Sequence, residues 1–320
     1  SVLVSGMRYG GQAYFALDVT DGNSTEPEVL WEFSDMDDPD MGFSYGQATV
    51  VRVSSIGEWV ALIPNGYNNS EKDYANPLDP RNRISTTGNA VLYAVRLRDG
   101  QLLAKIDTGV GTVATPNGLA TVAAVDSEFQ TPPSETNPRV DYGADYAYGG
   151  DLYGNLWRFD LTDTSPGNWS ATRIVKANGI KDRPITVRPQ IVAVPDGIQT
   201  AENDVIVMYA TGKYLEPSDR SINLPADQYI VGVIDGLTST DTDLSIDTGN
   251  FVEQTFTLTA GGNLRDVSSN YVNHSTDHGW KIKLPEQGER VFNPLKLIGN
   301  EALLVTSNIT AGTDPCERGG

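Results

Sequence analysis

Acidic and amide residues gather in one long polar stretch, residues 126–151, which reads DSEFQTPPSETNPRVDYGADYAYGGD. Calcium binds six to eight oxygen atoms from carboxylates, amides and carbonyls, and a loop that carries such groups at alternate positions can wrap the ion. Asn137, Asp141 and Asp145 stand at positions one, five and nine of such a wrap, and the carbonyl group of Gly143 lies between the last two. The spacing predicts a calcium site in this loop.

One residue of the loop argues against a bound ion. Arg139 stands where a ligand would be expected, and a positive charge at that position opposes a cation. A long acidic loop without a metal is therefore the alternative interpretation of the same residues.

A second acidic cluster lies in SDMDDPDMGFSYG, with Asp35, Asp37, Asp38 and Asp40. Four like charges within six residues repel one another unless water or a cation neutralises them. Pro39 interrupts the ligand spacing and no distal glutamate follows, so the sequence favours a solvated turn over a second calcium site.

Residues for nucleophilic catalysis are scarce. The chain has two histidines, His274 and His278, and one cysteine, Cys316. The histidines are four positions apart, as metal ligands on a helix would be, but NYVNHSTDHGW is rich in Ser, Asn and Gly and has no helical pattern. Ser-His-Asp and Cys-His chemistry are disfavoured, and we expect no enzyme, although carboxylate pairs for glycoside chemistry are left open.

A strand, an Asp-bearing turn and a second strand recur along the chain and must position these loops. Copies occur at 13–35, 90–109 and 150–175, with a diverged copy at 227–236. Apolar and polar residues alternate in them, as in antiparallel hairpins, and Val- and Ala-rich runs such as GQATVVRV and EWVALIPNGY supply two more strands ahead of the later copies. Four strands per unit, repeated around an axis, predict an all-β fold, a β-propeller of four-stranded antiparallel blades.

The blades must carry long loops, because the turns recur at wider intervals than the roughly 40 to 50 residues of a compact blade. The candidate loops are polar and rich in turn residues, and they span 68–88, 126–144, 216–227 and 236–250. Long loops on a rigid scaffold are common binding sites. The repeats run through the whole length without a linker, which favours a single β-propeller domain from residue 1 to residue 320.

Three tryptophans follow the strand pattern, namely Trp31, Trp59 and Trp157. We expect them to pack inside or between blades, because large aromatic side chains contribute much of the buried apolar area of a core. A platform on which a carbohydrate stacks is the alternative.

Composition narrows the classes of partner. The 42 acidic and 23 basic residues give a net charge of −19, which repels nucleic acid and anionic membrane surfaces and favours cations. No run of 18 apolar residues occurs, so no transmembrane segment is predicted in this chain. A lone cysteine at position 316, followed closely by a Gly-Gly end, suggests a fragment of a longer protein.

Several motifs occur together in an order that resembles a known family. YAYGGDLYGNLWRFDL at 146–161 is similar to the hallmark of the C-terminal β-propeller of the PilC/PilY family, the type IV pilus tip-associated adhesins and biogenesis factors. GQAYFALDVTD, VMYATGKYL, QYIVGVID and GWKIKLPEQGERVFNPLKLIGNEALLVTSNIT agree with it in order. The resemblance covers nearly all of the chain.

The resemblance implies a modified seven-bladed propeller, with some irregular blades, that lies outside the cell at the pilus tip or outer membrane. It implies roles in pilus assembly, in opposing retraction and in adhesion, with minor pilins or tip components and a host or abiotic surface as partners. It also implies a calcium loop just before the GGDL segment. Its final ligand matches Asp145, an earlier one matches Asp141, and its start matches Asn137 or, across an insertion, Asp126.

Two other functions stay open. VLYAVRLRDGQLL also resembles the strand–turn–strand units of quinoprotein dehydrogenase propellers, although the chain has no adjacent cysteine pair and no repeated tryptophan docking pattern. A propeller that binds glycans is the other alternative.

Overall fold

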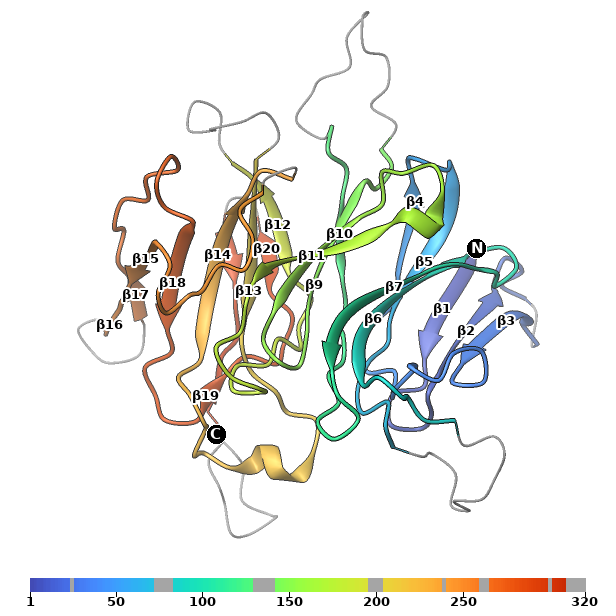
Figure 1. Ribbon diagram of the computed structural model, residues 1–320, viewed down its shortest axis with the longest axis horizontal. Coiled ribbons are helices and arrows are strands. Elements are labelled where there is room, and N and C mark those ends of the chain that lie inside the picture. The colour runs from blue at the N-terminus through green and yellow to red at the C-terminus, as the bar shows by residue number, and fades with distance from the viewer. Residues whose placement is uncertain are drawn as a thin grey trace, which may run out of the picture. The chain divides into compact units, whose positions relative to one another are not determined.

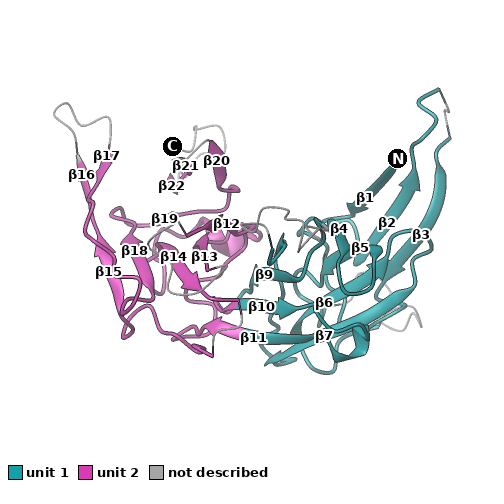
Figure 2. Cartoon of the chain, turned by 90° about the horizontal axis from the view of Figure 1, so that it is seen from above, with its two compact units in different colours: residues 1–152, 157–172 teal, residues 153–156, 173–320 magenta. Residues whose placement is uncertain are grey.

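The computed structural model describes residues 1–23, 26–71, 83–128, 142–194, 204–237, 240–258, 265–298 and 301–308 of the chain. In these ranges the regular elements are β-strands apart from two short 3₁₀ helices, η1 (Pro166–Asn168) and η2 (Pro217–Arg220) (Figure 1). The chain divides into two compact units, which Figure 2 colours separately: residues 1–152 with 157–172, and residues 153–156 with 173–320. The predicted all-β class is confirmed.

Three sheets carry the strands of the first part of the chain. Their strand orders are β1-β2-β3, β4-β5-β6-β7 and β11-β10-β9-β8. The strands are β1 (Val2–Gly6), β2 (Ala13–Asp18), β3 (Glu28–Ser34), β4 (Thr49–Val53), β5 (Glu58–Pro64), β6 (Asn89–Arg96), β7 (Leu102–Gly111), β8 (Ala123–Val125), β9 (Tyr146–Gly150), β10 (Leu156–Asp160) and β11 (Ser170–Val175). The hairpins predicted at 13–35 and 90–109 are β2–β3 and β6–β7, and both are antiparallel.

The second unit holds one larger sheet and three two-stranded sheets. The larger sheet has the order β12-β13-β14-β18-β15, and the small ones pair β16 with β17, β19 with β22 and β20 with β21. The strands are β12 (Gln190–Ala193), β13 (Val205–Ala210), β14 (Tyr229–Asp235), β15 (Phe251–Gln254), β16 (Phe256–Leu258), β17 (Arg265–Val267), β18 (Gly279–Lys283), β19 (Glu289–Arg290), β20 (Lys296–Ile298), β21 (Glu301–Leu303) and β22 (Ser307–Asn308). The diverged repeat at 227–236 supplies β14, whose second partner is β18, far along the chain, and β15 joins β18 in parallel.

The middle strands of the β4–β7 sheet are buried on both faces. In β6, Leu92 packs into one apolar cluster of unit 1 while Val91 and Tyr93 pack into another. In β5, Leu62 and Ile63 divide between the same two clusters. Side chains of a strand alternate between its faces, so this burial places an apolar layer on each side of the sheet. A sheet covered on both sides is the arrangement expected of a blade with neighbours.

The turn after β6 explains why Trp31 is buried. Gly100 has a positive φ of 74°, and a Cβ atom at this position would lie 2.5 Å from the Cβ atom of Trp31. The indole N–H of Trp31 donates to the carbonyl oxygen of Leu97 in the same turn, at 2.8 Å. Only glycine meets both the left-handed backbone and the close approach.

The predicted burial of the three tryptophans is confirmed for Trp31 and Trp157 and is wrong for Trp59, which is 56% exposed. Trp59 is the second residue of β5, at the end of the strand where the apolar cover of the sheet stops. Hydrophobic character cannot show by itself whether anything covers a strand end.

The predicted pairs of extra strands are confirmed as β4 and β5, β8 and β9, and β12 and β13. A single domain over residues 1–320 stays a prediction. Within the described ranges, none of the helices has the length or the apolar character that crossing a membrane requires.

Candidate functional site

The predicted calcium loop leaves the third sheet after β8 and returns at β9. At its neck the carboxylate Oδ2 of Asp145 accepts hydrogen bonds from the backbone N–H of Ser127 at 2.9 Å and from the Ser127 hydroxyl at 2.6 Å. The backbone N–H of Asp145 donates to the carbonyl oxygen of Val125 at 3.0 Å. These bonds draw the two ends of the loop together at the end of the β8–β9 pair.

The neck is also attached to the edge of the neighbouring sheet in unit 1. The N–H of Ala144 donates to the carbonyl oxygen of Arg52 at 2.7 Å, and the N–H of Ser54 donates to the carbonyl oxygen of Ala144 at 3.1 Å. Gly143, whose carbonyl was a predicted ligand, is buried beside this bridge. The loop therefore starts from a backbone that two sheets hold in place.

The predicted ligands fall into two groups. Asp126, Gly143 and Asp145 lie at the neck, where Oδ1 of Asp126 accepts from the N–H of Glu128 at 2.7 Å. Asn137 and Asp141 lie outside the described residues, as does Arg139. The described part of the chain contains no cluster of three or more His, Cys, Asp or Glu side chains that could hold a metal. Calcium binding therefore stays a prediction.

The chemistry of the neck fits a calcium ligand set in part. Hydrogen bonds from described residues reach only Oδ2 of the half-buried Asp145, so Oδ1 is available to an ion. A carboxylate with one oxygen fixed and one available is a suitable hard oxygen donor. Asp145 would then close the ligand set from a fixed position. The bond from Ser127 is a feature that sequence reasoning missed.

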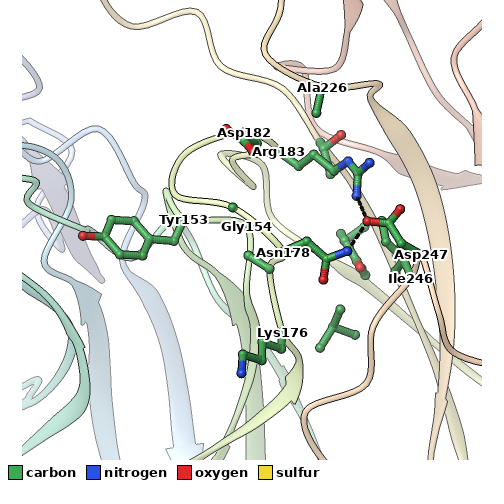
Figure 3. Close-up of a pocket in the computed structure, with 14 residues that line it drawn as sticks. Tyr153, Gly154, Lys176, Asn178, Asp182, Arg183, Ala226, Ile246 and Asp247 are labelled. Carbon is green, nitrogen blue, oxygen red and sulfur yellow. Dashed lines mark hydrogen bonds and ion pairs between the residues drawn. The ribbon is translucent and has the colours of Figure 1, made fainter.

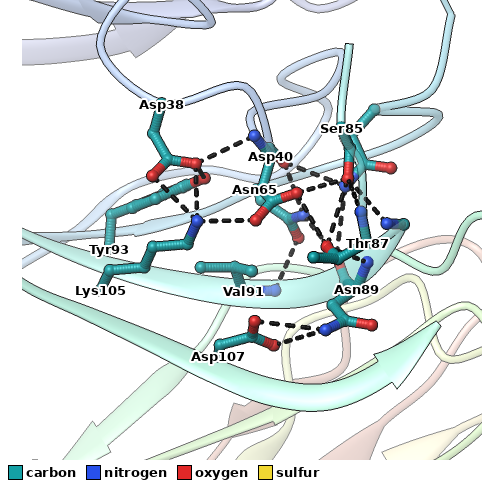
Figure 4. A network of polar contacts seen from close by, with 12 residues as sticks. Asp38, Asp40, Asn65, Ser85, Thr87, Asn89, Val91, Tyr93, Lys105 and Asp107 are labelled. Carbon is teal, nitrogen blue, oxygen red and sulfur yellow. Dashed lines mark hydrogen bonds and ion pairs between the residues drawn. The ribbon is translucent and has the colours of Figure 1, made fainter. Parts of the chain in front are cut away.

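The second acidic cluster is not a solvated turn. Asp35 and Asp40 are buried, so that prediction is wrong for both, while Asp37 is exposed. The ammonium group of Lys105 on β7 lies 2.9 Å from Asp38 Oδ1 and 2.6 Å from Asp40 Oδ2 (Figure 4). A side chain from another strand thus supplies the neutralising charge in place of water or calcium.

Hydroxyl groups also stabilise the charges of these carboxylates by hydrogen bonding. Asp40 accepts hydrogen bonds from Ser85 and, at 2.9 Å, from the hydroxyl of Thr87, and Asp38 accepts from the Tyr93 hydroxyl at 3.0 Å (Figure 4). Burial acts to raise the pKa of Asp40, but the hydrogen bonds from Lys105, Ser85 and Thr87 outweigh it and leave the pKa lowered. The carboxylate is held ionised, which suits a structural ion pair and not a proton donor.

The aspartates of the GGDL segment have separate structural roles. Asp151 is fully buried, and its Oδ2 accepts from the indole N–H of Trp157 at 2.8 Å and from the amide of Asn117 at 2.9 Å. Asp160 and Asp163 each accept the backbone N–H two residues ahead, at Thr162 and Ser165. Such bonds are typical of turns, so Asp160 and Asp163 mark turns and Asp151 is part of the core.

A pocket with a cavity volume of about 200 Å³ lies in unit 2 (Figure 3). In it the guanidinium of Arg183 contacts the carboxylate of Asp247 at 2.7 Å, and Asn178 also donates to Asp247. Burial acts to raise the pKa of Asp247, but the pairing with Arg183 leaves it lowered. These residues come from segments far apart in the sequence, so no local pattern could have predicted the pocket.

The two histidines do not form a metal site with other His, Cys, Asp or Glu side chains in the described ranges. His278 Nδ1 lies 4.0 Å from Asp241 Oδ2, and its ring is tilted against Phe251 with the ring centroids 6.1 Å apart. His274 lies separately in the loop before β18. The loop interpretation of this segment is confirmed.

The whole chain is similar to proteins of known family. A profile of the family described as the PilY1 beta-propeller domain matches residues 1–266. The type IV pilus biogenesis factor PilY1 of Pseudomonas aeruginosa strain UCBPP-PA14 is 29% identical over all of this chain, and a PilY1 homolog of Xylella fastidiosa is 29% identical over 90% of it. The crystal structure of the P. aeruginosa PilY1 C-terminal domain superposes with a TM-score of 0.72 at 28% identity, over 96% of this chain and 64% of that one.

The chain spans only part of these relatives. It corresponds to 29% of the P. aeruginosa protein and to 18% of the Xylella homolog. Each relative is named as a pilus biogenesis factor or its homolog. The family is described as a β-propeller domain, which agrees with the β4–β7 sheet that is buried on both faces.

Proposed function

We propose that this chain, which belongs to the family of PilY1 β-propeller domains, is the non-enzymatic propeller of a type IV pilus biogenesis factor that also mediates adhesion. The observation that carries the proposal is the match of the family profile to residues 1–266, together with the structural likeness over 96% of the chain. We place the protein at the cell surface, at the pilus tip or outer membrane. Minor pilins or other tip components and the surface to be colonised are the partners.

The way in which unit 1 holds its long loop supports a binding role. The middle strands of the β4–β7 sheet are buried on both faces, and hydrogen bonds from this sheet and from β8 hold the neck of a long loop. Loops on such scaffolds commonly carry recognition. The net charge of −19 disfavours anionic partners over most of the surface.

Pilus assembly tests this proposal directly. In a piliated bacterium whose own PilY1-type gene is deleted, expression of the full-length protein that contains this chain should restore surface pili. The same protein without residues 1–266 should not, because the matched domain is then missing. Pili are sheared from the cells and measured by immunoblot of the major pilin. Equal amounts of pilin from both strains would contradict the proposal.

We further propose that the loop from Asp126 to Asp145 binds Ca²⁺ through Asp145 and Asp126, with Asn137, Asp141 and the Gly143 carbonyl as further ligands. The ion would supply positive charge among these oxygen atoms and order the loop. Millimolar calcium should raise the melting temperature by roughly 5 °C, since a ligand at 100 times its Kd stabilises by about 2.7 kcal/mol.

Asp145→Ala should abolish the difference between calcium and chelator, whatever it does to the melting temperature without calcium. Asp163→Ala is the matched control, because Asp163 also accepts bonds in a turn but lies outside the loop, and it should keep the calcium response. Differential scanning calorimetry measures both. Identical melting curves of the unsubstituted chain in calcium and in chelator would overturn the calcium proposal and leave the pilus role standing.

A further inference from the structure

A shallow groove in unit 1 places two exposed aromatic side chains beside the loop neck. Trp59, on β5, is 56% exposed, and Tyr142, in the returning end of the loop, is 81% exposed. The groove has a volume of about 280 Å³, and Val50, Arg52 and Asp126 also line it. The structure thus joins one strand pair and both ends of the loop in a single surface feature.

The backbone around this groove is fixed. Arg52 of β4 stands opposite Trp59 of β5 in the antiparallel register. The carbonyl of Arg52 accepts the N–H of Ala144, two residues after Tyr142. Tyr142 itself has a positive φ of 52°, an unusual conformation for an aromatic residue. Such backbone conformations occur often at binding sites.

The chemistry of the groove is amphipathic. Trp59 and Tyr142 offer flat apolar faces with polar edges, which suit a ligand that is apolar on one side and polar on the other. Arg52 brings guanidinium N–H donors. The chain as a whole carries −19, which disfavours an anionic ligand. A neutral ligand with several hydroxyl groups matches this environment better than an anion does.

We propose that this groove binds a neutral sugar ring of a surface glycan. The C–H face of the ring stacks on Trp59, Tyr142 closes the other side, and the ring hydroxyls accept hydrogen bonds from Arg52. The volume is near the lower limit for small-molecule sites, which suits one ring at the end of a glycan chain. The inference rests on the proposed adhesive function and names the class of ligand.

A glycan array probed with the purified chain tests the proposal, followed by calorimetric titration with methyl glycosides of glucose, galactose, mannose and N-acetylglucosamine. At least one neutral glycoside should bind. Trp59→Ala and Tyr142→Ala should each weaken binding about tenfold or more, because a stacked aromatic is the energetic centre of such a site. Trp59→Phe, which keeps an aromatic face, should bind within about threefold of the unsubstituted chain.

Tyr271→Ala is the matched control, since Tyr271 is 79% exposed and lies in unit 2, and it should bind as the unsubstituted chain does. Unchanged melting temperatures will show that the variants fold. No binding to any neutral glycan, binding only to sialylated or sulfated glycans, or binding that survives Trp59→Ala would each overturn the proposal. Sugar binding is measured on the purified chain and pilus assembly in cells, so either can fail without the other.

Discussion

Replacing Asn65 with alanine is expected to lower the free energy of unfolding by about 3 to 5 kcal/mol, because the buried side chain makes four hydrogen bonds. Its amide Nδ2 donates to the carbonyl oxygens of Asp40 and Asn89, both at 2.9 Å. Its Oδ1 accepts the backbone N–H groups of Val91 and Leu119, both at 3.0 Å. The amide uses both donors and both acceptor positions.

These four bonds join separate parts of unit 1, and the Asn65 backbone adds bonds to Gly42 and Val91 in two of the same parts. They link the segment after β3, the start of β6 and the segment before β8 (Figure 4 shows the first two). The surrounding backbone is tightly packed, since a Cβ atom on the next residue, Gly66, would lie 2.1 Å from the carbonyl oxygen of Phe43. Alanine would remove the acceptor of the N–H groups of Val91 and Leu119, which costs more than the bonds alone contribute. The carbonyl oxygens of Asp40 and Asn89 would keep their bonds from Asn69.

Asn69→Ala is the matched control for this variant. Asn69 is also buried and donates to the same two carbonyl oxygens, but at 3.1 and 3.2 Å, and its Oδ1 has no hydrogen-bond partner in the described structure. Its loss should cost about 1 kcal/mol. Urea denaturation followed by tryptophan fluorescence measures both variants. If both variants lose the same free energy of unfolding, the four hydrogen bonds of Asn65 do not contribute the expected stability.

The strands could be predicted from the sequence because a strand leaves a local mark, the alternation of apolar and polar residues between turns. This alternation predicted the strands β6 and β7, and also β12 and β13 ahead of β14. The alternation could not predict which strands pair when a long connection separates them. Examples are the antiparallel pair β14 and β18 and the parallel pair β15 and β18. It also could not show that Asn65, within an ordinary turn sequence, bonds to Leu119, 54 positions away.

The candidate site shows the same division. The candidate ligand Asp145 was predicted from a local motif, and the structure places it at the loop neck. The cation that pairs with the second acidic cluster could not be predicted from a local motif, because Lys105 and Asp40 are 65 positions apart in the sequence. The groove beside Trp59 is lined by β4, β5, β8 and both ends of the loop, which are far apart in the sequence, so no local pattern could predict it.

Replacing Lys105 with methionine is expected to lower the free energy of unfolding by about 2 to 3 kcal/mol at pH 7, since hydrogen bonds between charged groups contribute about 1.5 to 3 kcal/mol. Methionine keeps most of the packing of the lysine stem but leaves Asp38 and Asp40 without their cation. The side chain of Asp40 is 5% exposed, so water can replace little of the lost neutralisation.

The dependence on pH separates this electrostatic loss from a loss of packing. The pKa of Asp40 is lowered below its ordinary value of 3.8, so its contribution is present above that pH and is lost as the pH falls through the lowered value. Burial acts to lower the pKa of Lys105, but its bonds to Asp38 and Asp40 raise it above 10.5, so its contribution is present below that pH and is lost only in stronger base. The difference between the unsubstituted chain and Lys105→Met should therefore be largest near neutral pH and should shrink below about pH 4.

An exposed ion pair of the same chemistry supplies the control. Lys283 lies 2.7 Å from Asp227, but both side chains are about half exposed, so Lys283→Met should change the free energy of unfolding far less than Lys105→Met does. Urea denaturation of both variants between pH 3 and pH 9 measures the two effects. A loss in Lys105→Met that stays constant down to pH 3 would mean that the lysine stem stabilises unit 1 by packing alone. A loss that disappears in acid would mean that the ammonium group of Lys105 stabilises unit 1 by neutralising Asp38 and Asp40.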